Sequence, residues 1–331
     1  MDLMSSYFVK TYINQGLDYH YLTHASPCLN VIATPLIGDS RLDVTMVDFG
    51  PVLMIKRLNH GAAIEEYRFP AHVMGIQLPT NLDQSVDVFR QSPGGQCHTP
   101  FLTSGAKAQW VVPDNVPFYQ LHIDARWLRK LLGESAMRDY LELSLAPSRK
   151  AYDRGTLFTV AAACDLALQV GLTARENKQA LSSDDIAQLI KQILLPCLQS
   201  ELLEFKASPR QKILGKALDY IHKHYASPIS LTTLAEVSAT SVRNLQMVFK
   251  NELDVSPGSY IQQFRLHRFR HTLAMAASVT EAAYASGFKH LGRLTERYAQ
   301  VFNHKPSSQL SSEPVQPLEL GDPFQGDWQA S

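Results

Sequence analysis

The chain has 331 residues, 45% of them hydrophobic, so it can bury more than one core and is not disordered by composition. Its net charge of zero hides an asymmetry, because residues 209–310 hold 13 Lys and Arg against 6 Asp and Glu, a net +7, which leaves −7 on the remainder. A basic segment attached to an acidic one indicates that one part faces a polyanion and the other does not.

The N-terminal stretch and the cysteines favour an intracellular protein. The first 20 residues lack the apolar stretch of a signal peptide, and we find no apolar run long enough to span a membrane. Without CxxC or disulfide spacing, four scattered cysteines are expected to be small core hydrophobes: Cys28, Cys97, Cys164 and Cys197. We therefore expect a cytoplasmic protein with no membrane partner.

Short apolar runs alternate with turn residues from about Leu29 to Ile123. Pro, Gly, Asn and Asp separate the runs, for example at Gly50-Pro51 and Pro113-Asp114-Asn115. Short strands at this spacing predict a β-sandwich or barrel.

From about Ala125 the pattern becomes helical. Ser182 and Ser183 supply an N-cap for the last of these helices, and Pro196 predicts a kink or break in it. The helices are predicted over residues 126–132, 157–172 and 184–205, followed by a linker at 207–209 and, at the C-terminus, a mobile acidic tail over 311–331.

The segment after the linker contains a weak internal repeat. Residues 230–250 and 278–298 each have the features of a helix-turn-helix: a Ser at the start, a small residue where the helices cross, and a second helix with one apolar face. Gly287 can adopt the left-handed conformation in the second turn. The outward positions of the second helices are polar and can bond base edges and phosphates: Arg243, Asn244, Gln246, Lys250, Lys289, Arg293, Glu296 and Arg297.

A basic helix is predicted between the two units. It begins at Ser256-Pro257, an N-cap followed by Pro at the first helical position, and runs to Leu273. We expect it to act as a rigid spacer that sets both reading helices on one face of the DNA. Its basic side chains are Arg265, Arg268, Arg270 and His271.

Over roughly residues 210–310 the chain resembles the DNA-binding domain of the AraC/XylS family, and residues 287–294 are similar to the XylS branch in particular. The residues that carry the resemblance are Leu234-Ala235, Ser241, Arg243, Leu245-Gln246, Phe249, Ser256-Pro257, Tyr260-Ile261, Arg265-Leu266, Val279-Thr280-Glu281, Ala283, Gly287-Phe288 and Pro306-Ser307.

The resemblance implies an α+β chain. Residues 1–206 would form a sensory and dimerisation domain with a cupin-like β-barrel or sandwich and dimerisation helices. Residues 209–310 would form an all-α domain with two helix-turn-helix units, and 311–331 a tail. The implied partners are double-stranded DNA, RNA polymerase and a second copy of the chain, and the implied function is a transcriptional regulator of the activator type.

The resemblance also implies that the two reading helices enter successive major grooves. The base-facing positions are then Arg243, Gln246, Met247, Gly292, Arg293 and Glu296. Expected backbone contacts are Ser241, Asn244, Lys250, Lys289 and Arg297. Met247 stands where many family members carry Arg, which favours a thymine-methyl contact over a guanine contact.

For the N-terminal domain, the resemblance implies a small-molecule effector bound in the barrel, with an aromatic or carboxylate-bearing compound as the candidate. Candidate pocket residues are Arg57, Tyr67, Arg68, Phe69, Trp110 and Tyr119, although such aromatics can also simply fill a barrel. Candidate dimerisation residues are Leu189, Ile193 and Leu194.

Two other readings stay open. The first is a ligand-independent or peptide-responsive regulator whose N-terminal domain only dimerises. The second is a metal-binding cupin, for which the spacing is poor and no HxH is present. Its candidate ligands are His60, Glu65, Glu66, His72, His98 and His122. No nucleotide-binding or catalytic fingerprint is present, so we expect no enzyme activity and no cofactor.

Overall fold

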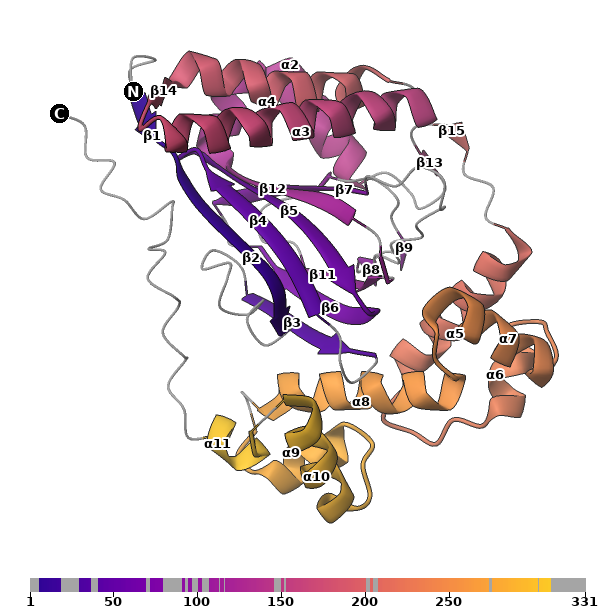
Figure 1. Ribbon diagram of the computed structural model, residues 1–331. Coiled ribbons are helices and arrows are strands. Elements are labelled where there is room, and N and C mark those ends of the chain that lie inside the picture. The colour runs from indigo at the N-terminus through magenta and orange to yellow at the C-terminus, as the bar shows by residue number, and fades with distance from the viewer. Residues whose placement is uncertain are drawn as a thin grey trace.

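The computed structural model has a β-rich N-terminal part and an all-helical C-terminal part (Figure 1), as the sequence predicts. The residues that the structure describes are 6–18, 30–36, 41–69, 72–79, 91–92, 95–96, 101–102, 107–112, 114–115, 117–145, 150–151, 153–200, 203–204, 208–273, 276–302 and 304–310. The predicted tail at 311–331 lies outside them.

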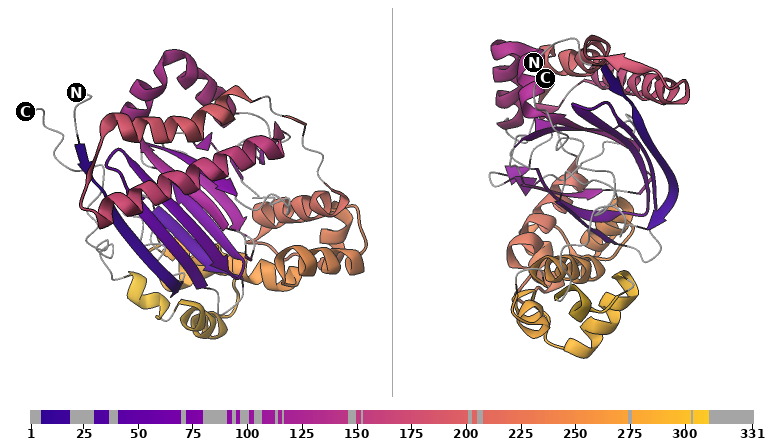
Figure 2. Two further views of the ribbon diagram at one scale, coloured as in Figure 1. Left: turned by 45° about the horizontal axis from the view of Figure 1, so that its top comes forward. Right: turned by 90° about the vertical axis from the view of Figure 1, so that its left-hand side faces the viewer.

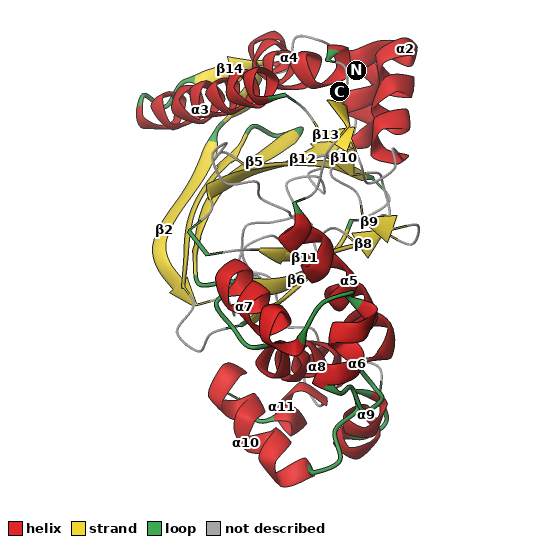
Figure 3. Ribbon diagram, turned by 90° about the vertical axis from the view of Figure 1, so that its right-hand side faces the viewer, coloured by secondary structure: helices red, strands yellow, loops and turns green. Residues whose placement is uncertain are grey.

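Two antiparallel sheets face each other in the N-terminal part (Figure 3). The six-stranded sheet has the order β10(Phe101–Leu102)-β7(Val73–Pro79)-β12(Pro117–Asp124)-β5(Val52–His60)-β4(Arg41–Asp48)-β2(Lys10–Asp18). The five-stranded sheet has the order β3(Asn30–Pro35)-β6(Ala63–Arg68)-β11(Lys107–Val112)-β8(Gln91–Ser92)-β9(Gly95–Gln96). Among the described strands the two sheets share no ladder, so they form a sandwich rather than a closed barrel.

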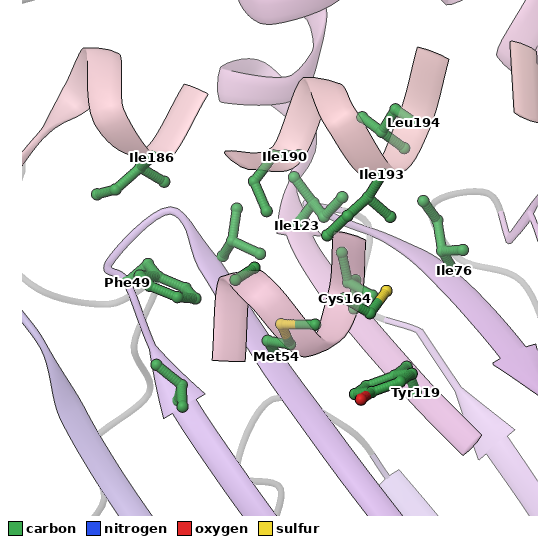
Figure 4. Close-up of a cluster of buried hydrophobic side chains, with 14 of the residues drawn as sticks. Phe49, Met54, Ile76, Tyr119, Ile123, Cys164, Ile186, Ile190, Ile193 and Leu194 are labelled. Atoms are coloured by element: carbon green, nitrogen blue, oxygen red, sulfur yellow. The ribbon is translucent and has the colours of Figure 1, made fainter. Parts of the chain in front are cut away.

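Three helices cover the outer face of the six-stranded sheet (Figure 1). Side chains alternate between the two faces of a strand, so Val52 and Met54 of β5 face the helices, while Leu53 and Ile55 face the other sheet. Figure 4 shows the core that results, with helix and strand side chains interleaved. The helices are α2(Ala125–Leu145), α3(Arg154–Glu176) and α4(Ser183–Gln199), and two small ribbons flank them: β1(Ser6–Phe8) with β14(Ala180–Ser182), and β13(Lys150–Ala151) with β15(Leu203–Glu204).

The helix α4 differs in length from its prediction. Ser182 caps it in a capping box with Asp185, as expected from the serine and acidic run. Pro196 neither kinks nor breaks the middle of the helix, because it lies in the last turn, and the helix ends at Gln199 rather than near 205. Within α2, Gly133 has φ 72°, which divides a longer helix than the sequence predicted.

Helix α3 corrects the expectation that no apolar run is long enough to span a membrane. Its residues Gly155–Glu176 are long and apolar enough by length and composition. A third of the tested window is buried within the structure, and the core helix of a soluble protein passes the same test.

The C-terminal part holds two hydrophobic clusters joined by one helix, α8(Pro257–Leu273). The helices of this part, coloured orange to yellow, lie together in both views of Figure 2. Tyr260 and Phe264 of α8 belong to the first cluster, and Leu266 and Phe269 belong to the second. Each helix-turn-helix therefore packs on its own half of α8. The other helices are α5(Pro209–His224), α6(Leu231–Val237), α7(Val242–Leu253), α9(Val279–Ala285), α10(Leu291–Phe302) and α11(Pro306–Leu310).

The helix α8 also docks onto the five-stranded sheet of the N-terminal part (Figure 1). Ile64 of β6 joins the first C-terminal cluster, Thr34 Oγ1 lies 3.0 Å from His267 Nδ1, and Arg270 donates to the carbonyl of Ala33 at 3.1 Å. The helix is therefore covered on both sides. Of the basic side chains of this spacer helix, Arg270 and His271 are buried.

Candidate nucleic-acid interface

The first helix-turn-helix is built by local capping and a small core. Ser230 caps α6 by accepting from the amide of Thr233, and Ser241 caps α7 by accepting from the amide of Asn244. Leu245 and Phe249 hold the inner face of α7 in the first cluster. These contacts hold the inner face of α7 against the core, so the opposite face of the helix is exposed to solvent.

The exposed face of α7 carries three of the predicted base-reading residues, Arg243, Gln246 and Met247. Met247 is 51% exposed on this face. Of the predicted backbone contacts on this helix, Asn244 bonds Thr240 at 2.8 Å and Lys250 pairs with Asp254 at the C-cap.

The second unit uses the same construction. Ser278 caps α9 by accepting from Glu281, and Gly287 in the turn has φ 82°, as predicted. A Cβ on Gly287 would lie 2.8 Å from the carbonyl oxygen of Tyr225, so the turn also needs glycine for its close approach to the first unit. Leu294 and Tyr298 of α10 are buried in the second cluster.

The outer face of α10 carries the other three predicted base-reading residues, Gly292, Arg293 and Glu296, all exposed. Lys289 is exposed just before the helix, whereas Arg297 is partly buried and donates to Gln262 Oε1 of α8. The structure thus presents two polar helix faces on one domain.

A groove of about 660 Å³ lies between the two units, formed by the loop before α6, the start of α8, and the turn and first half of α10. Arg265 and Arg297 line it, and partial burial lowers the pKa of both guanidinium groups. Arg265 donates to the carbonyls of Tyr225 and Ser227 at 2.7 and 2.8 Å.

The predicted effector residues divide between two places. Arg57 is fully buried between the sheets, where it bonds Glu65 and Asn59 and lies 4.3 Å from the ring centre of Phe118. Tyr119 instead faces the helices and bonds Asp165 of α3, so it is not in the space between the sheets. The side chains of Tyr67, Arg68 and Trp110 lie outside the described residues.

The remaining predicted pocket residue, Phe69, is buried with its ring edge-on to His122, 5.8 Å between centres. Burial lowers the pKa of His122 to about 3, so its imidazole is neutral at pH 7. Asn59 Nδ2 and Gln77 Oε1 are buried here without a hydrogen-bond partner in the described structure. Sequence analysis did not single out Asn59 or Gln77, although strand alternation places both on the face opposite Met54 and Ile76.

The predicted dimerisation residues need a correction. Ile193 and Leu194 are fully buried against the sheet (Figure 4), so they belong to the core of their own domain. Leu189 is partly buried on the same core. Among the described residues of this layer, α3 carries two large exposed apolar side chains, Phe158 at 67% and Leu166 at 51% exposure, besides Leu141 of α2 at 37% and Phe8 of the flanking β1 at 74%.

The candidate metal ligands are not brought together among the described residues. Glu65 bonds Arg57 between the sheets, whereas Glu66 points the other way, toward α8. His60 pairs with Asp43 at 2.8 Å. His98 lies outside the described part.

Comparison with known proteins identifies the helical part. A helix-turn-helix domain family matches residues 234–311. The XylDLEGF operon transcriptional activator 2 of Pseudomonas putida is 30% identical over 135 residues, which are 40% of this chain and 86% of that protein. The chain belongs to the AraC/XylS family of transcriptional regulators.

Other similarities extend along the chain of this AraC/XylS-family member. A probable thc operon regulatory protein of Rhodococcus erythropolis is 27% identical over 307 residues, covering 84% of this chain and 89% of that protein. An AraC-type regulator from Chromobacterium violaceum has a solved structure that matches 30% of this chain and 90% of its own, with 27% identity and a TM-score of 0.29. The assignment to the AraC/XylS family rests on the sequence matches.

Proposed function

We propose that the protein is a sequence-specific, DNA-binding transcriptional regulator. The observation that carries the proposal is the pair of exposed polar helix faces on α7 and α10, held on one spacer helix in a domain of net charge +7. Arg243 and Arg293 are the exposed guanidinium groups of these faces, and Arg is the side chain that most often reads guanine in the major groove.

Substitution of these two arginines tests the proposal. A duplex is first selected from a random library with the wild-type protein, and binding is then compared on that duplex and on random DNA. Arg243→Ala and Arg293→Ala should each weaken binding to the selected duplex by about 1–3 kcal/mol and relax the preference at one base pair.

Lys212→Ala, which removes an exposed cation from α5, is the matched control and should leave base preference intact. Equal losses on both DNAs for Arg243→Ala and Arg293→Ala would place these residues on phosphates instead. In the cell, discrete sites of genome occupancy should disappear in the double variant.

The protein is further proposed to be a cytoplasmic activator that contacts RNA polymerase. The support is that relatives in Pseudomonas putida are named transcriptional activators. Transcription from a promoter next to an occupied site should fall when the gene is deleted. A rise would make the protein a repressor.

The N-terminal domain is proposed to bind a small aromatic or carboxylate-bearing effector between its two sheets. Buried polar atoms without partners, such as those of Asn59 and Gln77, cost free energy that a ligand can recover. Arg57 is already paired with Glu65, so an effector carboxylate has to replace Glu65 at that guanidinium. A panel of aromatic carboxylates should include compounds that raise the melting temperature of wild type but not of Asn59→Ala; no shift with any member would contradict a carboxylate effector.

A homodimer is the proposed assembly, and α3 supplies the proposed contact. Phe158, Ala162 and Leu166 recur every four residues on the exposed side of that helix. An exposed apolar stripe of this kind is typical of a surface that a second protein covers.

A further inference from the structure

The groove between the two helix-turn-helix units combines apolar and basic side chains. Ile229 and Phe288 are partly buried and contribute apolar surface to its volume of about 660 Å³. Among the described residues that line it, none is Asp or Glu, whereas five are basic: Arg265, Lys289, His290, Arg293 and Arg297. These five come from α8, from the turn after α9 and from α10, so the folded domain brings them together.

Two guanidinium groups of the groove lack counter-ions. Arg265 donates to backbone carbonyls through Nε and Nη2, and Arg297 donates through Nη1 to the amide oxygen of Gln262. Neither group forms an ion pair with a carboxylate in the described part of the chain, although both are partly buried. A partly desolvated cation bonded only to neutral oxygens retains a strong preference for an anion.

The apolar side chains indicate what kind of anion fits. A bare oxyanion is satisfied by N–H donors and gains nothing from Ile229 or Phe288. Covering these two side chains takes apolar groups, and neutralising the arginines takes carboxylates. An acidic peptide with interspersed apolar residues supplies both, and clusters of Arg recognise acidic motifs in this way.

This chain contains such a peptide directly after the helix-turn-helix domain. The tail, residues 311–331, lies outside the described part, and its sequence contains no Lys, Arg or His. Its acidic residues are Glu313, Glu319, Asp322 and Asp327, and its large apolar residues are Val315, Leu318, Leu320, Phe324 and Trp328. The tail therefore matches the groove both in charge and in its mixture of acidic and apolar side chains.

The tail starts close enough to reach the groove. The last described helix, α11, ends at Leu310 and packs on α8, α9 and α10, of which α8 and α10 line the groove. The 21 residues that follow can span at most about 70 Å. A domain of about 100 residues has a radius of gyration of only about 13 Å. Because the tail is tethered, its effective concentration at the groove is of millimolar order.

We propose that residues 313–328 of the tail dock in this groove and compete there with DNA. The competition rests on the DNA-binding function proposed above, whereas the docking does not. Docking pairs tail carboxylates with Arg265 and Arg297, and it covers Ile229 and Phe288 with apolar side chains. Arg293 belongs both to the groove and to the predicted DNA-reading face, so the docked form binds DNA less well. The apparent affinity for DNA falls with the fraction of protein that is docked.

Carbodiimide cross-linking of the full chain tests the docking. The reagent joins a lysine amine to a carboxylate that it contacts, so Lys289 should be joined to tail carboxylates, as mapped by mass spectrometry. Lys216 is the matched control, because it is exposed on α5 of the same domain, outside the groove. Its yield with the tail should be several-fold lower. Equal yields at Lys216 and Lys289, or no product at Lys289, would overturn the proposal.

A mixture of ¹⁵N-labelled and unlabelled protein identifies which chain supplies the tail. Products that join Lys289 to the tail should contain two peptides with the same label. Labelled and unlabelled peptides joined in statistical proportion would place the tail in the groove of a second copy, which would refute docking within one chain.

Phe324→Ser combined with Trp328→Ser tests the apolar part of the contact. The double variant keeps every tail carboxylate, and it should reduce the product at Lys289 several-fold because the groups that cover Ile229 and Phe288 are lost. An unchanged yield would mean that charge alone attracts the tail, and the groove would be refuted as a peptide site.

Neutralising the tail should tighten DNA binding. A full-length variant with Glu313→Gln, Glu319→Gln, Asp322→Asn and Asp327→Asn should bind both the selected duplex and random DNA several-fold more tightly, with base preference unchanged. The control makes the same change in charge at exposed positions of α2 and α3, namely Glu134→Gln, Asp139→Asn, Glu142→Gln and Glu176→Gln. Its affinity should change by less than about twofold, because solvent screens exposed charges at this range. Equal gains in both variants would mean that net charge, and not docking, limits DNA binding.

DNA itself separates this proposal from the proposed function. A saturating amount of the selected duplex should abolish the product at Lys289, and a product that persists would refute the competition. If the product forms in the free protein but selection returns no preferred duplex, the proposed regulator fails while the docking stands. If a preferred duplex is bound and no product forms in the free protein, the regulator stands and the docking is refuted.

Discussion

Glu65 and Glu66 are consecutive residues of β6, and their carboxylates point to opposite sides of the five-stranded sheet. Glu65 bonds Arg57 between the two sheets. Glu66 lies 3.0 Å from Arg268 Nη1 of α8 and 3.3 Å from His271 Nε2. One strand thus connects the proposed effector space with the helix on which both DNA-reading units are mounted.

Glu66→Gln should loosen α8 from the sheet. Burial alone would raise the pKa of Glu66, but hydrogen bonds and charge from His267 and His271 outweigh it and hold the pKa well below its usual range, so the carboxylate is ionised. Loss of its charged hydrogen bond to Arg268 should cost about 1.5–3 kcal/mol of unfolding free energy, measured by urea titration.

Amide hydrogen exchange gives that prediction a spatial test. Exchange should become faster in α8 and in β3, which pairs with β6 and packs on α8, and remain slow in α4. Glu236→Gln, at an exposed position of α6, is the control and should change neither stability nor exchange. Uniformly faster exchange throughout the chain would mean that Glu66 has no specific role in docking α8.

Two buried histidines predict acid sensitivity. Burial lowers the pKa of His122 and of His222 to about 3, below the ordinary value of 6.5. Between these values the unfolded chain binds more protons than the folded one, so stability is lost as the pH falls below about 6.5. The expected slope is about 1.4 kcal/mol per pH unit for each histidine.

Urea titrations at pH 7.5 and 5.5 measure this loss. His122→Leu should remove about 1.4 kcal/mol per pH unit of this loss. The remainder comes from His222 and from His267, whose pKa is also lowered by burial. His290→Gln, at an exposed position, should leave the loss unchanged. A stability that is the same at both pH values would show that these imidazoles are hydrated in solution.

Substitution by alanine should change the stability in opposite directions at two nearby glycines. Gly287→Ala should destabilise the C-terminal domain by about 1–3 kcal/mol, because φ is 82° and the new Cβ meets the backbone of Tyr225 and Ala226. Gly292→Ala lies in open space in α10 and should stabilise it by up to about 1 kcal/mol. Thermal melts of both variants decide the matter, and similar losses in both would contradict the special requirement at Gly287.

The exposed stripe of α3 predicts the oligomeric state. Phe158→Ser with Leu166→Ser should convert dimers to monomers in sedimentation, with little change in the melting of the monomer, because both side chains are in solvent. Val237→Ser, at an exposed apolar position of α6, is the control. A double variant that remains dimeric would move the interface elsewhere.

Local features of the C-terminal domain were predictable because they depend on neighbours in sequence. Ser230, Ser241 and Ser278 cap their helices by accepting a hydrogen bond from the amide three residues ahead, and Gly287 satisfies the φ of its own turn. Such chemistry is visible in a short stretch of sequence.

Long-range placement was not predictable in the same way. Alternation along β12 does not say which face meets helices and which meets a sheet, so Tyr119 was assigned to the wrong side. An amphipathic helix such as α4 needs a partner, but its pattern does not distinguish its own sheet from a second chain, as with Ile193. The contact between Glu66 and Arg268 joins residues 202 positions apart, and no local rule reports it.

The burial of α8 on two sides limits how far this protein can be recombined. If one face of the spacer helix were exposed to solvent, the N-terminal part of one relative could be joined to the helix-turn-helix units of another. Here Ile64 and Glu66 of the N-terminal part complete the surroundings of Phe264 and His267, so a graft must carry both halves of that surface. Substitutions on β6 and α8 should therefore occur together in related sequences. The helix-turn-helix domain expressed alone should be prone to aggregate.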